Sequence, residues 1–151
     1  MKKKLTLILL LMIVSAISSA DDAPSPEQVP MLSDKEISCL ETVIQNETGG
    51  DHRQGAIEVG ATVFNRVRST KKKKTICAVA YQPKQFSNIK AIRPSMISAR
   101  AKSTTAEIIQ LHYEDALPKN ILFFHADYVT PNWAHRLKRI IKKGNHIFYA
   151  K

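Results

Sequence analysis

Two cysteines, Cys39 and Cys77, restrict the fold of this 151-residue chain more than any other feature. They are the only cysteines in the sequence and stand 38 positions apart (77 − 39). A disulfide between them would close a long loop and stabilise the fold by about 4 kcal/mol, because it restricts the unfolded chain. The alternative is two separate buried thiols, since free cysteine is readily buried. The compartment in which the chain folds decides between the two.

The first twenty residues have the organisation of a signal peptide. Lys2, Lys3 and Lys4 form a positive start, residues 5–17 form an apolar run, and Ser18-Ser19-Ala20 is a small-residue cleavage site. The apolar run is short for a membrane-spanning helix, which needs about 20 residues. An uncleaved N-terminal anchor is the alternative, whereas a lipoprotein anchor lacks a cysteine after Ala20. We therefore expect an exported protein, periplasmic or secreted to the cell wall, in which a disulfide can form.

Cleavage after residue 20 would leave 131 residues (151 − 20), which suits one domain with one core. Residues 21–32 contain three prolines and no hydrophobic periodicity, which predicts a flexible lead-in before a domain at 33–151. The net charge falls from +10 to +7 when the three lysines of the signal are removed (10 − 3). A basic exported domain suits an anionic polymer. No nucleic-acid-binding motif is present, so we expect neither a nucleic-acid partner nor membrane contact beyond the signal.

Hydrophobic periodicity predicts a mainly helical domain. The first helix should begin at Ser33, which forms a capping box with Glu36, and end near Glu47 because two glycines follow. Further helices are expected at 54–68, 76–80, 98–116 and 131–141, with Pro118 ending the fourth and Pro131 starting the fifth. Strands are expected at 121–125 and 146–149, pairing antiparallel around the last helix. Residues 71–74 form a lysine-rich loop, and residues 81–94 form a loop or a short strand.

Glu47 is the residue that most suggests chemistry. It lies at the end of the first predicted helix, with only Thr48 between it and Gly49-Gly50. Bare backbone beside a carboxylate leaves space for a bulky substrate. A single glutamate is usually solvated, so the segments downstream decide its function.

Six short motifs follow one another from this point. They are Glu47-Thr48-Gly49-Gly50-Asp51, Asn65-Arg66-Val67, Cys77 with Val79-Ala80-Tyr81-Gln82, Gln85-Phe86-Ser87, His125-Ala126-Asp127-Tyr128-Val129-Thr130-Pro131-Asn132-Trp133, and Gly144-Asn145-His146-Ile147-Phe148-Tyr149. In this order, from about Cys39 to Tyr149, the chain resembles the SleB/CwlJ-type cell-wall hydrolases, which cleave peptidoglycan. Each motif alone is weak, but six in order are specific. An arginine of the family pattern is Gly49 here, and its second glutamate is Asp51.

The resemblance implies a fold and a reaction. The fold is an α+β, mainly helical, lysozyme-like single domain, with a small antiparallel β element formed by the later segments. The reaction is cleavage of the β-1,4 bond between N-acetylmuramic acid (MurNAc) and N-acetylglucosamine (GlcNAc) in peptidoglycan glycan strands. Many members resemble lytic transglycosylases, which leave a 1,6-anhydro-MurNAc end and use no metal or cofactor.

Glu47 is carried over as the general acid and base, which requires an apolar pocket that raises its pKa. The side chains expected to bind the glycan are Gln85, Phe86, Ser87, His125, Tyr128, Trp133 and Tyr149. Phe148 is a further candidate for an aromatic wall, although each aromatic residue could instead belong to the core. His146 is expected to be mainly structural, with a supporting role near Glu47 as the alternative. Asp51 is either a second acid near Glu47 or a cap for the next helix.

Three other functions are compatible with the sequence. A metallohydrolase could use the five histidines, but the sequence has no His-Glu-x-x-His motif and no paired-cysteine zinc spacing. A non-catalytic, basic cell-wall-binding or scaffold module would have no need of Glu47. A hydrolytic muramidase or glucosaminidase would cleave the glycan with water and leave a reducing end.

Overall fold

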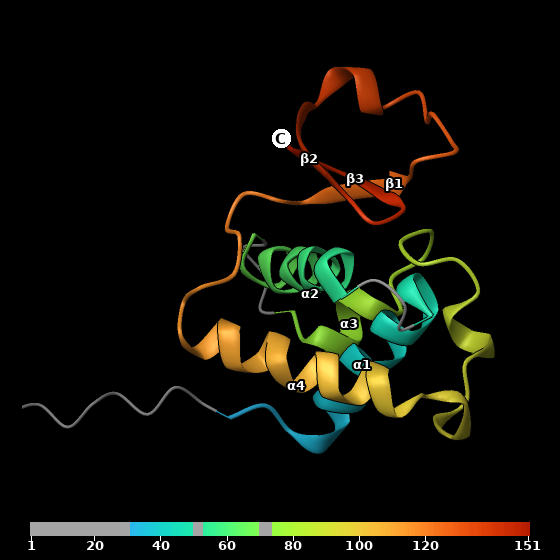
Figure 1. Cartoon of the computed structure of the whole chain (residues 1–151), viewed down its shortest axis with the longest axis vertical. Helices are drawn as coiled ribbons and strands as arrows, with labels where there is room; N and C mark the ends of the chain where they lie inside the picture. Colours follow the sequence, from blue (N-terminus) through green and yellow to red (C-terminus); the bar gives the residue numbers. More distant parts are fainter. Residues whose placement is uncertain (1–30, 50–52, 70–73) are drawn as a thin grey trace, which may run out of the picture.

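The computed structural model describes residues 31–49, 53–69 and 74–151 (Figure 1). The expected signal peptide, most of the expected lead-in, Asp51 and three of the four lysines in the lysine-rich loop lie outside these residues. No helix in the described part is long and apolar enough to cross a membrane.

Four α-helices form the larger part of the domain. They are α1 (Asp34–Thr48), α2 (Arg53–Arg68), α3 (Ile76–Ala80) and α4 (Ala99–Tyr113). The hydroxyl of Ser33 accepts a hydrogen bond from the backbone N–H of Glu36, as the predicted cap requires. Gly49 ends α1 in the left-handed conformation, with φ of 56°. Helix α4 ends at Tyr113, five positions before Pro118, so the prediction that proline ends this helix is wrong.

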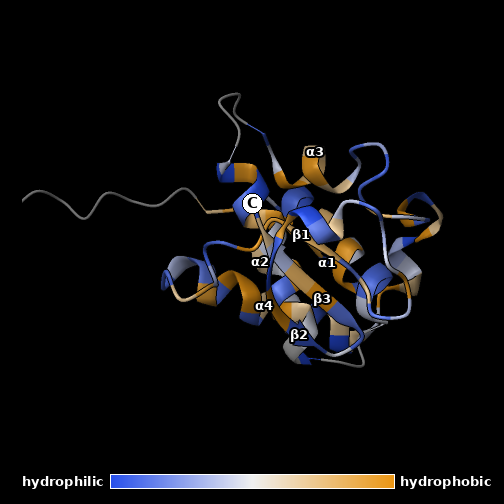
Figure 2. Cartoon of the chain, turned by 90° about the horizontal axis from the view of Figure 1, so that it is seen from above, coloured by the Kyte–Doolittle hydropathy of each residue, from blue (hydrophilic) through white to orange (hydrophobic). Residues whose placement is uncertain are grey.

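The helices pack around a core that α1 and α2 share with α4. Leu40, Val43 and Ile44 of α1 are fully buried, as the periodicity predicts. A Cβ added at Gly60 of α2 would lie 2.5 Å from Ile108 Cγ2 of α4, so only glycine lets these helices approach so closely. Figure 2 shows hydrophobic stretches along α1, α2 and α4, whereas hydrophilic residues prevail in the outer loops.

The predicted disulfide is confirmed. Cys39 of α1 is bonded to Cys77 of α3, and their Cα atoms lie 5.2 Å apart. The bond joins the middle of α1 to a helix of only five residues. A helix this short has little stability of its own, so the disulfide and the cap at Thr75 hold it in place.

The C-terminal third forms a three-stranded antiparallel sheet of β1 (Phe123–Ala126), β2 (Lys138–Lys143) and β3 (His146–Ala150), with β3 in the centre. Strand β1 pairs with β3 in a register that sets Phe124 opposite Phe148 and Ala126 opposite His146. In Figure 1 the sheet lies on the side of α2 opposite α4. The prediction of two antiparallel strands is confirmed, and the sheet contains a third strand.

The predicted helix at 131–141 is wrong. This segment contains one turn of 3₁₀-helix (Ala134–Arg136) and then enters β2. The residues Gly144 and Asn145 form a two-residue hairpin loop between β2 and β3, with φ of 53° at Gly144. A hairpin of this kind favours β pairing over the helical tendency of the lysine-rich segment. Residues 81–94 form a loop with one 3₁₀-helix, Ile89–Ala91, before a second at Pro94–Met96, so the alternative of a short strand is wrong.

Candidate active site

Glu47 lies in the last turn of α1, where Asn46 holds its carboxylate by a hydrogen bond. The amide of Asn46 donates a hydrogen bond to Glu47 Oε1 at 2.7 Å and another to the backbone oxygen of Ser87 at 2.9 Å. Asn46 therefore joins the end of α1 to the loop after α3. Gly49 lies two positions after Glu47, and apart from its chain neighbours no atom lies within 4 Å of where its Cβ would stand.

Burial raises the pKa of Glu47 above its ordinary value, while the hydrogen bond from Asn46 and the charge of Arg66 act in the opposite direction. Only 14% of the Glu47 side chain is exposed. The net direction is the one that a general acid needs, because a raised pKa keeps the carboxyl protonated to higher pH.

The sheet brings His146 close to the same carboxylate. Its Nε2 lies 3.9 Å from Glu47 Oε2, and only 10% of its side chain is exposed. The ring meets Phe124 of β1 edge-on, with centroids 5.1 Å apart. An aromatic neighbour of this kind fixes the orientation of the imidazole beside Glu47.

A cleft of about 440 Å³ opens beside Glu47. Of the predicted site residues, those that line it are Glu47, Gln85, Ser87, His125, Tyr128 and His146. Tyr128 is 84% exposed, so its ring stands at the rim and is available to a ligand. The cleft thus combines one buried carboxylate with polar side chains and an exposed aromatic ring, as expected for sugar binding.

Two hydrogen bonds hold the ring of His125 in place. Its Nδ1 lies 2.8 Å from the backbone oxygen of Ala126, and its Nε2 lies 2.8 Å from Tyr149 Oη. A carbonyl only accepts, so Nδ1 carries a proton, and Nε2 bonds to the Tyr149 hydroxyl, which can donate or accept. Trp133 packs edge-on against the ring at 5.6 Å. Both nitrogens are engaged, which suits an oriented wall of the cleft better than a proton-transfer group.

Three predicted binding residues do not line the cleft. Phe86 is only 6% exposed and packs against Phe124 in the core. Tyr149 is 7% exposed and lies behind His125. Trp133 lines a neighbouring pocket instead. Phe148, the further aromatic candidate, is fully buried, and Asp51 lies outside the described residues.

The sequence analysis missed Asn46 and Arg66 as site residues. Arg66 Nε donates to the backbone oxygen of Leu122 at 2.9 Å, and its guanidinium carbon lies 5.5 Å from the ring centre of Phe86. Burial lowers the pKa of Arg66 to about 10, although the charge of Glu47 acts in the opposite direction. The sequence did contain a signal for Arg66. It follows Val59 and Val63 at helical spacing, which places a charged residue on the buried face of α2.

The sequence model of the Cell Wall Hydrolase family matches residues 50–149. The chain belongs to this family. A spore cortex-lytic enzyme of Bacillus cereus is 25% identical over 118 residues, which cover 77% of this chain and 44% of that protein. One from Oceanobacillus iheyensis is 24% identical over 136 residues, covering 89% and 49%. The chain therefore spans about half the length of the curated relatives it matches.

Two solved structures share the fold of this chain. The catalytic domain of the germination-specific lytic transglycosylase SleB from Bacillus anthracis is 23% identical with a TM-score of 0.63, covering 84% of this chain and all of that one. The catalytic domain of Bacillus cereus SleB is 24% identical with a TM-score of 0.64, covering 85% and 99%. The resemblance to SleB-type enzymes and the α+β, mainly helical fold class are thereby confirmed. The family match begins just after Glu47, so a function for Glu47 depends on the geometry of the cleft.

Proposed function

We propose that this chain cleaves the β-1,4 bond between MurNAc and GlcNAc in peptidoglycan, as a lytic transglycosylase with Glu47 as its general acid and base. The observation that carries the proposal is the state of Glu47. Its carboxylate is mostly buried, burial raises its pKa, and it lines a cleft of about 440 Å³. Membership of the Cell Wall Hydrolase family supports peptidoglycan as the substrate.

The reaction needs a single carboxyl group. Protonated Glu47 gives its proton to the bridging oxygen, the bond from that oxygen to C1 of MurNAc breaks, and an oxocarbenium-like centre forms. The 6-hydroxyl of the same sugar then forms a bond to C1, and its proton returns to Glu47. This attack is favourable because nucleophile and electrophile belong to one molecule. The products are a 1,6-anhydro-MurNAc end and a free GlcNAc hydroxyl.

The composition of the cleft supports this mechanism over hydrolysis by two carboxylates. Among the described residues that line it, Glu47 is the only acid. A glycosidase with two carboxylates needs the second at a defined separation from the first. Asn46 and His146 are assigned positioning roles, because each holds or faces one oxygen of Glu47. Gln85, Ser87, His125 and Tyr128 are assigned to glycan binding.

Export belongs to the same proposal. Residues 1–20 would direct the chain out of the cytoplasm, residues 21–32 would be a lead-in, and 33–151 would be the enzyme domain acting in the periplasm or cell wall. The confirmed disulfide supports an oxidising compartment.

The test compares the wild-type chain with Glu47→Gln on purified peptidoglycan. We expect soluble muropeptides from the wild type and a loss of about 10²- to 10⁴-fold in the variant, the usual contribution of acid–base catalysis. Glu114→Gln, the same change at an exposed glutamate after α4, is the matched control. Equal release by wild type and Glu47→Gln would contradict the assignment of Glu47 as the acid, and no release by either would favour a non-catalytic wall-binding module.

Mass spectrometry of the products tests the finer assignment. Anhydro ends have lost the mass of one water relative to reducing ends. Reducing ends in place of anhydro ends would contradict the transglycosylase reaction and indicate a hydrolytic muramidase or glucosaminidase.

A further inference from the structure

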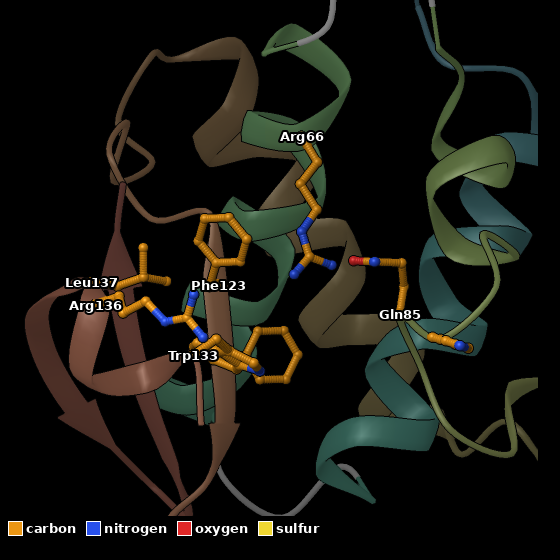
Figure 3. Close-up of a pocket in the computed structure, with 8 residues that line it drawn as sticks. Arg66, Gln85, Phe123, Trp133, Arg136 and Leu137 are labelled. Carbon is orange, nitrogen blue, oxygen red and sulfur yellow. The ribbon is translucent and has the colours of Figure 1, made fainter. Parts of the chain in front are cut away.

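A second pocket of about 460 Å³ adjoins the cleft (Figure 3). It shares Gln85 and Phe124 with the cleft, so the two form adjoining parts of one surface. Phe123 and Trp133 supply its aromatic wall on the sheet side. In Figure 3, Arg66 points from α2 into the space between Phe123 and Gln85.

This pocket is cationic. Arg66, Lys84 and Arg136 line it, and no aspartate or glutamate is among its described lining residues. In the described part of the chain, Lys84 and Arg136 form no ion pair with a carboxylate. Arg66 Nη1 is buried and has no hydrogen-bond partner among the described residues. Glu47 interacts with Arg66 from outside the pocket, but Lys84 and Arg136 have no such compensation among the described residues, so the pocket is suited to an anion.

The backbone at Lys84 adds a separate observation. Its φ is 64°, a left-handed conformation that is uncommon for lysine. Such a conformation costs free energy and persists only where the surrounding structure holds it. It places a lysine at the edge of the pocket, next to Gln85, which the pocket and the cleft share.

We propose that this pocket binds a carboxylate on the peptide stem of a MurNAc residue next to the bond that is cleaved. The proposal rests on the proposed function, since it assigns a stem-bearing glycan to the adjoining cleft. A peptidoglycan strand is neutral along its sugars and carries carboxylates on its stems. The aromatic wall of Phe123 and Trp133 suits the sugar, and the guanidinium of Arg136 suits a carboxylate. The enzyme therefore selects strands that still bear anionic stems.

Binding is measured in the Glu47→Gln background, so that no turnover is needed. The parent and its Lys84→Gln/Arg136→Gln variant are titrated with a soluble peptidoglycan tetrasaccharide-peptide. A second ligand is the same compound with its stem carboxylates amidated. Arg100→Gln/Lys102→Gln is the matched control, because it removes two exposed cations from α4, on the far side of the molecule from the sheet. Thermal melts verify that all variants fold.

We expect the Lys84→Gln/Arg136→Gln variant to bind the anionic ligand about 3- to 10-fold more weakly, as for two partly exposed ion pairs. The same variant should bind the amidated ligand as the parent does, and the control should change neither Kd by more than about 2-fold. Equal weakening for both ligands, weakening equal to that of the control, or no binding by the parent would overturn the proposal. If wild type releases no muropeptides while the pocket still distinguishes the ligands, the proposed catalysis fails and the pocket stands.

Discussion

The cleft has two walls with different physical construction. The helical wall carries Glu47 on α1, where Leu40, Val43 and Ile44 are fully buried and a disulfide fixes the helix to α3. The sheet wall carries exposed side chains, among them Tyr128 at 84% exposure. The proposed acid therefore stands on a helix anchored in the core, whereas Tyr128, a proposed glycan contact, stands on the part that water reaches. Substitutions in the first wall should change stability, whereas those in the second should change binding.

The largest expected effect concerns the helical wall. Replacing Cys39 and Cys77 together with serine should lower the free energy of unfolding by about 4 kcal/mol, because the unfolded chain regains the freedom of a 38-residue loop. Urea unfolding measures this difference. Arg139→Gln, on the exposed edge strand β2, is the control and should change stability by less than about 0.5 kcal/mol. If the free energy of unfolding falls by less than about 1 kcal/mol in the double variant, the stability of the fold does not depend on the helical wall as proposed.

The second prediction concerns the sheet wall. Tyr128→Ala should raise KM for peptidoglycan about 2- to 10-fold through the loss of an aromatic contact, while kcat changes little. Its unfolding free energy should stay within about 0.5 kcal/mol of wild type, since the ring is 84% exposed. Tyr81→Ala is the matched control, because Tyr81 is 42% exposed and does not line the cleft. Equal effects of the two substitutions on KM would contradict a binding role for Tyr128.

The two walls also differ in how far their structure could be predicted from sequence. Helix α1 is local in origin, since the cap at Ser33, the apolar periodicity and Gly49 each lie within it. Strand β2 is not local, because it depends on pairing with β3 across the hairpin at Gly144. A lysine-rich segment with two isoleucines fits helix or strand equally well on its own. Pairing with a neighbouring strand determines whether such a segment becomes helix or strand, and the hydrophobic periodicity of the segment does not reveal that pairing.

The candidate site also contains features that local sequence predicts and features that depend on distant residues. Glu47 was proposed from its surroundings in sequence, and two of them, the end of a helix and Gly49, are also its surroundings in space. The contacts of Asn46 with Ser87 and of Arg66 with Leu122 join positions 41 and 56 residues apart. Patterns within a short stretch of sequence cannot predict contacts between residues so far apart. Phe86 and Tyr149 were assigned to the cleft from their motifs, and only the packing of the sheet shows that both are buried.

The third prediction concerns Asn46, which joins the end of α1 to the loop after α3. Its hydrogen bond lowers the pKa of Glu47, so Asn46→Ala should raise that pKa further. A general acid must be protonated to act, so the alkaline fall of kcat/KM should move to higher pH. The maximum rate should drop about 3- to 10-fold, because the carboxylate loses one restraint. A pH–rate profile measures both effects. A shift toward lower pH would contradict the assignment of Glu47 as the acid.

The smallest expected effect is on stability at Glu47 itself. Burial raises its pKa in the folded chain above the ordinary value of 4.5, so the folded state binds the proton more tightly than the unfolded state. Stability is therefore lost as pH rises above 4.5 toward the folded pKa, so burial of Glu47 costs stability at pH 7. Glu47→Gln should raise Tm by a few degrees at pH 7, and this gain should disappear below about pH 4.

Glu41→Gln provides the control for this measurement, since Glu41 lies on the same helix and outside the cleft. Its Tm should follow that of the wild type at both pH values. A rise in Tm at pH 7 together with a loss of activity in Glu47→Gln would show that the buried acid is needed for activity and lowers the stability of the fold. If Glu47→Gln lowers Tm at pH 7, the carboxylate contributes more to the fold through Asn46 and His146 than burial costs. Glu47 would then be a structural residue of the wall, and the proposed acid would have to be sought elsewhere in the cleft.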